Sequence, residues 1–264
     1  MSVKIIICGA CGKMGGNVLS LLDGDTQATA VCGVDLFPKE IGIPVYKSFA
    51  EVTEEADVII DFSSPVGLKE RLDYAKANGL GVVLAATGFT ADDLKMVDEY
   101  AKEIAIFKTA NLSLGVNLMQ ALIKAAAEVL GDSYDVEIIE RHHNLKKDAP
   151  SGTALMLADT INEAFNGEKK FVNGREGIVG AREKTEIGIH AVRGGTIVGE
   201  HEVMFAGEDE IITITHSARS KRVFAVGAIR AAKFLSGKQA GMYEMKHLLA
   251  EENASFPLFI KTKF

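Results

Sequence analysis

Short apolar runs alternate with helical patterns through the first 110 residues of the chain. Five runs have the length and the β-branched content of strands: Val3–Cys8, Thr29–Val34, Val58–Phe62, Val82–Ala86 and Ile104–Lys108. Helical patterns occupy Met14–Leu22, Val66–Asn78 and a stretch that runs from a capping-box sequence at Thr90 to about Lys102. This alternation predicts βαβ units whose parallel sheet is buried on both faces.

The pattern changes after Asn111. It predicts a strand over Tyr134–Glu140 and helices over Leu114–Leu130, Ser151 to about Ala164, and Val223–Leu235. The stretch Phe171–Lys184 is polar and rich in glycine, which indicates a loop or an arm. Polar and apolar residues then alternate along Ile187–Arg193, Thr196–Phe205 and Glu210–Ser217, with glycine turns between them. These last three segments predict an antiparallel meander with one face toward solvent or a partner.

The two patterns together predict an α/β protein. We expect a Rossmann-type, doubly wound parallel sheet that carries an inserted α+β domain. Residues 1–111 and 223–264 would form the dinucleotide-binding domain, and residues 112–222 would form the insertion.

Composition narrows the class of protein. The 264 residues are 47% hydrophobic and 25% charged, which is ordinary for a globular protein. A net charge of −7 argues against a nucleic-acid-binding surface, which needs a basic stripe. No apolar run approaches the roughly 20 residues that span a bilayer, and the N-terminus has no signal-peptide pattern. We therefore expect a cytoplasmic protein with neither a nucleic-acid nor a membrane partner.

The chain has three cysteines, Cys8, Cys11 and Cys32. An odd number in a chain of this length does not indicate a disulfide framework. Cys8 and Cys11 have the C-x-x-C spacing of redox and metal sites. Buried structural thiols are the simpler interpretation, because Cys8 lies in an apolar strand and no second pair of ligands follows. We expect no metal.

A glycine-rich loop separates the first predicted strand from the first predicted helix. Gly9, Gly12 and Gly15 give the spacing G-x-x-G-x-x-G, a variant of the dinucleotide-binding fingerprint. Asp35 ends the second strand, where an acid can accept hydrogen bonds from the ribose hydroxyls of NAD. The alternative is a structural glycine turn with a surface aspartate.

The residues around Asp35 also bear on the choice between NADH and NADPH. The carboxylate repels a 2′-phosphate, and Leu36 stands where an arginine would bind one. Lys13 and Lys39 remain available to neutralise a phosphate, so we favour NADH and leave NADPH open. Two further loops, Asp61–Pro65 and Ala85–Phe89, follow strands at the edge where α/β proteins bind ligands, although either could be a plain connection.

The segment Glu140–Ala154 concentrates the candidate chemistry. His142 and His143 can move protons near neutral pH, and Lys146 and Lys147 add positive charge and a transferable proton. After Pro150, the sequence Ser151-Gly152-Thr153 opens a helix whose first amides have no internal partner, so an anion can approach them. The alternative interpretation is a polar strand-to-helix turn.

With both motifs in view, the chain resembles the 4-hydroxy-tetrahydrodipicolinate (dihydrodipicolinate) reductase family of lysine biosynthesis. The resemblance rests on the fingerprint Gly9–Gly15 and on the segments Asp61–Ser63, Thr87–Phe89, Ala110–Asn117, His142–Ala154 and Val192–His201. These segments follow one another in the family's order and extend over essentially the whole chain.

The resemblance implies that NAD(P)H reduces a small, cyclic, unsaturated dicarboxylate with loss of water. His142 would be the acid/base group and Lys146 the proton donor, while His143, Ser151, Gly152 and Thr153 would bind the substrate. Contacts to the cofactor would come from Gly9, Ala10, Cys11, Gly12, Lys13, Met14, Asp35, Ala85, Ala86, Thr87, Thr109, Ala110, Asn111 and Leu112. Family members are typically homotetramers assembled through the sheet of the second domain, which would then serve substrate binding and tetramerisation.

The chain departs from the family pattern at several positions. Many members have arginine where this chain has Lys13, and an acid followed by arginine where it has Asp35-Leu36. Ala85-Ala86 replaces the more usual Gly-Thr. The arginine expected near Phe224 is either Lys221 or Arg222 in this chain.

Three other functions stay open. An aspartate or homoserine dehydrogenase shares the two-domain plan but would not need His142-His143 joined to the helix at Ser151. A non-catalytic NAD(P) sensor would keep the fingerprint and Asp35 without needing both His142 and Lys146. The histidine segment could also be purely structural, for instance a contact between subunits.

Overall fold

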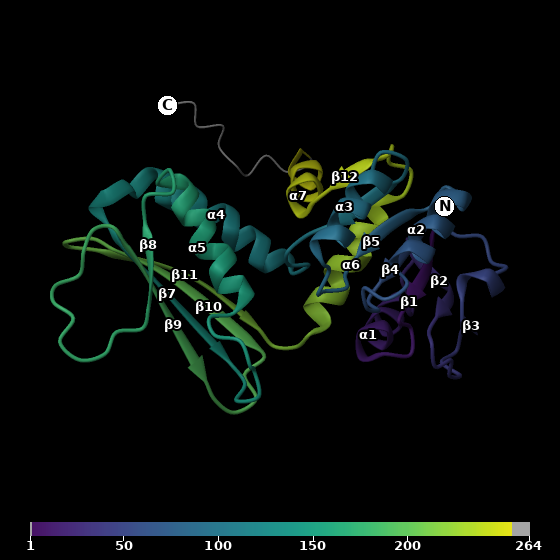
Figure 1. The fold of residues 1–264 in the computed structure, drawn as a ribbon, viewed down its shortest axis with the longest axis horizontal. Coiled ribbons are helices and arrows are strands. Elements are labelled where there is room, and N and C mark those ends of the chain that lie inside the picture. Colours follow the sequence, from purple (N-terminus) through teal and green to yellow (C-terminus); the bar gives the residue numbers. More distant parts are fainter. Residues whose placement is uncertain (1, 255–264) are drawn as a thin grey trace. The chain divides into compact units, whose positions relative to one another are not determined.

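The computed structural model describes residues 2–254, which form two compact units (Figure 1). The first unit is built from the residues up to Leu112 and from Arg222 onward, and the second is Ser113–Lys221. Each unit has its own sheet and its own hydrophobic core.

The sheet of the first unit has seven parallel strands within the described residues, in the order β12-β6-β5-β4-β1-β2-β3. Their bounds are β1 (Val3–Cys8), β2 (Ala28–Val34), β3 (Val45–Tyr46), β4 (Val58–Asp61), β5 (Gly81–Leu84), β6 (Ala105–Lys108) and β12 (Gly241–Tyr243). The predicted Rossmann-type sheet is therefore confirmed. The edge strands β3 and β12 were not predicted, because two or three residues carry no readable alternation.

Helices cover this sheet. The described ones are α1 (Lys13–Leu22), α2 (Leu68–Asn78), α3 (Ala91–Tyr100), α6 (Arg222–Leu235) and α7 (Met245–Ala254), with a 3₁₀ turn η1 at Phe49–Glu51. Side chains of α2 and α3 pack on Ile6, Ile59 and Val82 in one core cluster. On the other side, α1 packs against α6, which also lies along β4, β5 and β6. The strands are thus buried on both faces, as their apolar runs predicted.

The second unit has a five-stranded mixed sheet in the order β11-β10-β7-β9-β8. Its strands are β7 (Asp135–His142), β8 (Lys170–Asn173), β9 (Glu186–Arg193), β10 (Gly199–Ala206) and β11 (Ile211–Ala218). One face of the sheet packs against α4 (Leu114–Leu130) and α5 (Gly152–Ala164), and a 3₁₀ turn η2 spans Gly131–Ser133. The fold is therefore a Rossmann-type domain with an inserted α+β unit, as predicted.

The prediction of a simple antiparallel meander was right for β10 and β11, which pair antiparallel, and wrong for β9. Strand β7 lies between β9 and β10, pairing in parallel with β9 and antiparallel with β10. The connection after β9 crosses the end of β7, where the Gly194 amide donates to the His142 carbonyl at 2.9 Å. Strand β8 also falls at the start of the stretch predicted to be a loop, because its pairing partner β9 is distant in sequence.

The segment Leu114–Ser133 is long and apolar enough to cross a membrane by length and composition alone. The expectation that no run reaches this length was therefore wrong. In the structure, Met119, Ile123 and Ala127 of α4 are buried in the core of the second unit beside α5 and β7. A core helix passes the same test of length and hydropathy, so this segment is weak evidence for a membrane span.

Candidate active site

The fingerprint loop between β1 and α1 needs its glycines. Gly9 has a φ of +77°, a conformation that side chains other than glycine's rarely adopt. A Cβ on Gly15 would overlap the backbone of Gly9 and Ala10, so α1 packs closely on the loop only with glycine there. Helix α1 has no side-chain cap at Gly12 and no acid in its first turn, which leaves its N-terminal amides to an anion such as a pyrophosphate.

Asp35 ties the fingerprint loop to the end of β2. Its carboxylate accepts hydrogen bonds from the amides of Cys11 and Phe37, both at 3.0 Å. A cavity of about 370 Å³ lies beside it, lined by residues that include Gly9, Asp35, Phe37, Lys47, Ser63 and Arg71. This volume is in the range of small-molecule sites. The residues present therefore fit a dinucleotide.

The wall of this cavity contains a buried ion pair. Asp61 ends β4 with no exposed surface, and its carboxylate lies 2.9 Å from Nε of Arg71. The same guanidinium donates to the carbonyl oxygens of Ser64 and Val66, at 2.6 and 2.8 Å. Arg71 therefore fixes the loop after β4. The sequence predicted that this loop lies near a ligand only because it follows a strand at the ligand-binding edge of the sheet.

The remaining predicted cofactor residues follow neighbouring parallel strands. Ala85, Ala86 and Thr87 come after β5, and Thr109–Leu112 come after β6, where Thr109 donates to the carbonyl of Asn111 at 3.2 Å. Parallel strands end at the same edge, so these residues share it with the fingerprint.

The cysteines do not form a redox pair in this structure. Burial raises the pKa of Cys8 to about 12, which disfavours the reactive thiolate. Burial raises the pKa of Cys32 to about 12 as well. All three cysteines are free, and no metal-binding cluster of histidine, cysteine or acidic side chains occurs among the described residues.

In the second unit, His142 is the last residue of β7, and its ring lies on the buried face of the sheet. Its Nδ1 is 2.6 Å from Oε2 of Glu140, which has no exposed surface. Arg193 donates to both oxygens of the same carboxylate, each at 2.7 Å. The ring of His201 meets that of His142 edge-on at 5.2 Å between centroids. His142 is therefore surrounded by a built polar cluster.

The loop after β7 presents Lys146. Its amide donates to the carbonyl of His143 at 3.1 Å, and its ammonium pairs with Asp148 at 2.9 Å. The hydrogen bond from Lys146 holds the pKa of Asp148 below its usual range. The side chain of Lys146 is 20% exposed, whereas Lys147 lies in solvent, so the two neighbouring lysines have different environments.

Helix α5 begins at the predicted position. Ser151 is its cap, accepting from the amide of Ala154 at 3.2 Å, and the Ser151 hydroxyl also lies 3.1 Å from Nε2 of His201. The Ser151 amide donates to Glu140 at 3.0 Å. Gly152, next along, has open space beside its Cα. In this arrangement Ser151 shapes the helix start, and the exposed part of the N-terminus begins at Gly152.

Glu140, Arg193 and His201 have no role in the prediction from sequence. The predicted strand ends at Glu140, whereas β7 extends to His142, and the two-residue spacing then puts Glu140 and His142 on one face. Arg193 and His201 belonged to a matching segment but come from β9 and β10, and only strand pairing brings them to β7.

Lys221 and Arg222, the two residues considered for the cationic position near Phe224, have different surroundings. Arg222, the first residue of α6, donates to the hydroxyl of Ser20 in the same unit at 3.2 Å. Lys221 is an exposed residue of the second unit.

Comparisons with known proteins identify the family of this chain. The family model "Dihydrodipicolinate reductase, N-terminus" matches residues 3–112, and the model "Dihydrodipicolinate reductase, C-terminus" matches residues 115–249. The chain belongs to the dihydrodipicolinate reductase family. Members of this family are oxidoreductases that use a pyridine nucleotide, so the family assigns this chain the reduction of 4-hydroxy-tetrahydrodipicolinate in diaminopimelate and lysine biosynthesis.

Relatives named 4-hydroxy-tetrahydrodipicolinate reductase resemble the chain over nearly its full length. One from Caldanaerobacter subterraneus subsp. tengcongensis is 49% identical over 249 residues, which are 94% of this chain and 99% of that protein. Another from Clostridium novyi is 45% identical over 251 residues, 95% of this chain and 99% of that protein.

The chain is similar to a solved structure of the same family and to solved structures of other dehydrogenases that share the fold. A dipicolinate-bound dihydrodipicolinate reductase from Paenisporosarcina sp. TG-14 has a TM-score of 0.75 and 26% identity, and covers 92% of this chain and 98% of its own. An aspartate dehydrogenase from Thermotoga maritima has a TM-score of 0.51 with 14% identity, covering 90% of this chain and 99% of its own. The second likeness shows the fold alone, so it does not support the rival assignment as an aspartate dehydrogenase.

Proposed function

We propose that this chain reduces 4-hydroxy-tetrahydrodipicolinate with NADH, with its first unit holding the cofactor and its second unit holding the substrate. The observation that carries the assignment is the end of β7, where His142 is held by a buried carboxylate and is followed by Lys146 and the start of α5. A sensor or a structural contact does not need this arrangement of proton-carrying groups.

On the substrate side, each residue has a role suited to its environment. Gly152 and Thr153 would bind a substrate carboxylate with the first amides of α5, and His143 would contact the ring. Lys146, held beside Asp148, would give a proton to the electron density that hydride addition creates, and His142 would act as the acid/base group. Ser151 would act indirectly, by capping the helix.

On the cofactor side, Gly9–Met14 would hold the pyrophosphate at the start of α1. Asp35 would face the ribose, and Ala85–Thr87 and Thr109–Leu112 would border the nicotinamide. A bound reduced nicotinamide would supply the hydride. The charge of Asp35 favours NADH, while Lys47, in the wall of the same cavity, is the cation best placed to accept a 2′-phosphate.

We also propose a cytoplasmic homotetramer assembled through the sheet of the second unit. The support is the exposed apolar surface on β9, on β11 and in the loop before β9, where Val192, Ile211 and Ile178 are 45%, 63% and 105% exposed. Sedimentation velocity at micromolar concentration tests the assembly, and a monomer at the expected 28.3 kDa would contradict it.

The first experiment follows cofactor absorbance on mixing NADH or NADPH with freshly generated substrate. Lys146→Ala should lower kcat by about 10²- to 10⁴-fold, because it removes the proton donor, while cofactor binding measured by fluorescence stays intact. Lys147→Ala is the matched control, since it removes an exposed lysine next in sequence and should change kcat little.

The same assay separates the alternatives. Cofactor binding without oxidation by the wild-type protein would mean a different substrate or a sensor. Equal losses in the two lysine variants would remove the special role of Lys146. The ratio of NADH to NADPH activity, compared between Lys47→Gln and Lys39→Gln, tests which cation tolerates a 2′-phosphate.

A further inference from the structure

The carboxylate of Glu140 is fully buried and fully hydrogen-bonded. Its two oxygens receive two hydrogen bonds from Arg193 and one from the Ser151 amide, and Oε2 lies 2.6 Å from Nδ1 of His142. These four contacts use the acceptor sites of an ionised carboxylate. Of the three groups that make these contacts, only the imidazole can change its protonation near neutral pH.

The ionisation of Glu140 determines which ring nitrogen of His142 carries the proton. Burial alone would raise the pKa of Glu140, but the hydrogen bonds from Arg193 and His142 outweigh burial and hold that pKa below its usual range. An ionised carboxylate only accepts hydrogen bonds, so Nδ1 of His142 must carry a proton. In the neutral imidazole the lone pair is then on Nε2.

Within residues 2–254, the hydrogen bond of the His142 ring is made by Nδ1, and Nε2 makes none. Gly199 of β10 lies beside this atom, since a Cβ there would be 3.1 Å from Nε2. His201, also on β10, faces the ring but stays neutral, because burial and the neighbouring His142 lower its pKa to about 4. Lys146 on the following loop and Arg193 on β9 supply the positive charge near this cluster.

We infer that Glu140 and Arg193 form a positioning pair for proton transfer at His142. Glu140 keeps the proton on Nδ1, so that Nε2 is the atom that exchanges a proton with the substrate. Arg193 keeps Glu140 ionised, so that a proton taken up at Nε2 stays on the imidazole and is not passed to the carboxylate. This inference rests on the proposed acid/base role of His142.

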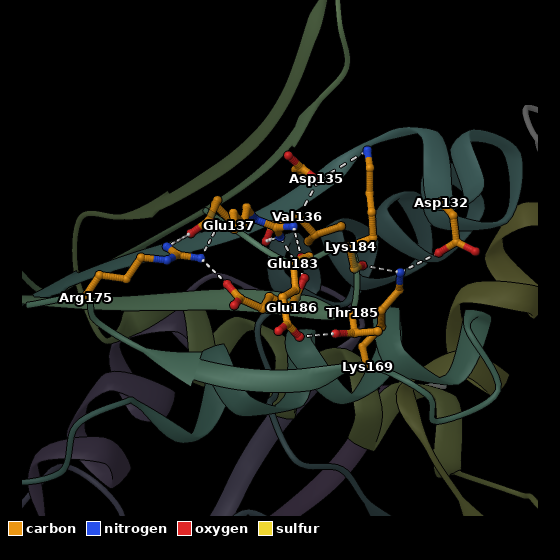
Figure 2. Close-up of polar contacts among 11 residues, drawn as sticks. Asp132, Asp135, Val136, Glu137, Lys169, Arg175, Glu183, Lys184, Thr185 and Glu186 are labelled. Atoms are coloured by element: carbon orange, nitrogen blue, oxygen red, sulfur yellow. Dashed lines mark hydrogen bonds and ion pairs between the residues drawn. The ribbon is translucent and has the colours of Figure 1, made fainter. Parts of the chain in front are cut away.

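A purely structural role for the pair predicts different results, because Glu140 also ties β7 to β9 and to the start of α5. The same strand offers a matched control. Glu137 lies three residues earlier on the opposite face and is bound by Arg175, Arg182 and Nε2 of His190 (Figure 2 shows its contact with Arg175). It is a carboxylate–arginine–histidine cluster without any proposed catalytic group.

The decisive measurement is the tautomer of His142 by ¹H–¹⁵N NMR of the histidine ring nitrogens, assigned from the loss of its signals in His142→Gln. The wild-type protein at pH 8 should show the proton on Nδ1, and this result needs no substrate and no variant at Glu140. In Glu140→Gln the proton should move largely to Nε2. A wild-type ring protonated on Nε2 would overturn the inference.

Kinetics supply the second readout. Glu140→Gln should lower kcat by about 10²-fold or more with a smaller change in KM, since carboxylates that fix a catalytic tautomer have effects of this size or larger. Arg193→Lys, which keeps the charge, should retain more activity than Arg193→Met. Glu137→Gln should leave kcat and the His142 signals unchanged.

The outcomes separate this inference from the proposed function. If the wild-type protein fails to oxidise cofactor with the substrate but shows the Nδ1–H tautomer, the reductase assignment fails and the positioning stands. If it turns over and Glu140→Gln keeps full kcat, or Glu137→Gln loses as much activity, the positioning role fails. If Glu140→Gln does not fold, two tests remain. They are the tautomer of His142 in the wild-type protein and the comparison of Arg193→Lys with Arg193→Met.

Discussion

In the part of the chain that the structure describes, each unit buries one carboxylate completely near the carboxyl end of a strand and pairs it with an arginine. Asp61 in β4 is bound by Arg71 and by the amide and hydroxyl of Ser63. Glu140 in β7 is bound by Arg193 and by His142. The partners of Asp61 all lie within the next ten residues of chain, whereas Arg193 of Glu140 comes from another strand.

The chemical difference between the two clusters is the imidazole. Among the described residues, none of the groups bonded to Asp61 changes its charge near neutral pH, so this cluster holds the loop beside the cavity that Asp35 lines. Glu140 holds a ring that can exchange a proton. In our proposal, a buried carboxylate–arginine pair would hold a binding loop in one unit and support proton transfer in the other. The difference between the two clusters is the imidazole of His142.

The largest effect should come from breaking the pair in the first unit. Arg71→Met leaves Asp61 buried without its cation, so the free energy of unfolding should fall by about 3–5 kcal/mol. The loop carbonyls of Ser64 and Val66 also lose their donor, so KM for NADH should rise. Thermal unfolding and initial rates measure the two effects.

A control on the same helix shows whether burial is the cause. Lys69 pairs with Asp73 at 2.7 Å on the surface of α2, with side chains 68% and 51% exposed. Lys69→Met should leave the free energy of unfolding nearly unchanged, because an exposed pair is screened by water. Similar losses of unfolding free energy in Arg71→Met and Lys69→Met would mean that burial does not increase the contribution of the Asp61–Arg71 pair.

An intermediate effect should come from acidification of the second unit. The pKa of His201 is lowered to about 4 by burial, whereas the unfolded chain takes up this proton near 6.5. Between these values the unfolded state binds more protons, so stability is full above about pH 6.5 and falls as the pH drops toward 4. The shift corresponds to about 3 kcal/mol.

Urea unfolding at pH 7.5 and pH 4.5 measures this loss. In His201→Gln, which keeps a polar group beside Ser151, the loss of stability between the two pH values should be smaller by about 2–3 kcal/mol. An identical loss in the variant and the wild-type protein would assign the acid sensitivity to other groups.

The smallest effect should come from a carboxylate at the surface. Asp25 pairs with Lys233 of α6 at 2.7 Å, and both side chains keep contact with water at 20% and 25% exposure. The hydrogen bond from Lys233 lowers the pKa of Asp25, so the contribution is present above the usual range of the aspartate and is lost as the pH falls through the folded pKa. Lys233→Gln should cost about 0.5–1 kcal/mol at pH 7, less in high salt. A cost near that of Arg71→Met would contradict the distinction between buried and exposed pairs.

Local sequence determined where most elements lie, because their signals are carried by neighbouring residues. Strand β1 and helix α4 have the predicted bounds. Helix α3 follows the predicted capping box at Thr90, and α5 begins at the predicted start of the helix near Ser151. The fingerprint glycines were also readable, since a left-handed turn and a close helix contact each demand glycine locally. The candidate proton-transfer and anion-binding residues from His142 to Thr153 were also readable, because they are close together in the sequence.

Only the tertiary structure decided how the candidate site is completed. Strand β7 inserts between β9 and β10. The alternation of polar and apolar residues along these strands does not predict that order. That insertion brings Arg193 and His201 to Glu140 and His142 across more than 50 residues of sequence. Hydrophobic period specifies which face of a strand is buried, but the choice of neighbouring strand depends on packing and hydrogen bonding between distant segments.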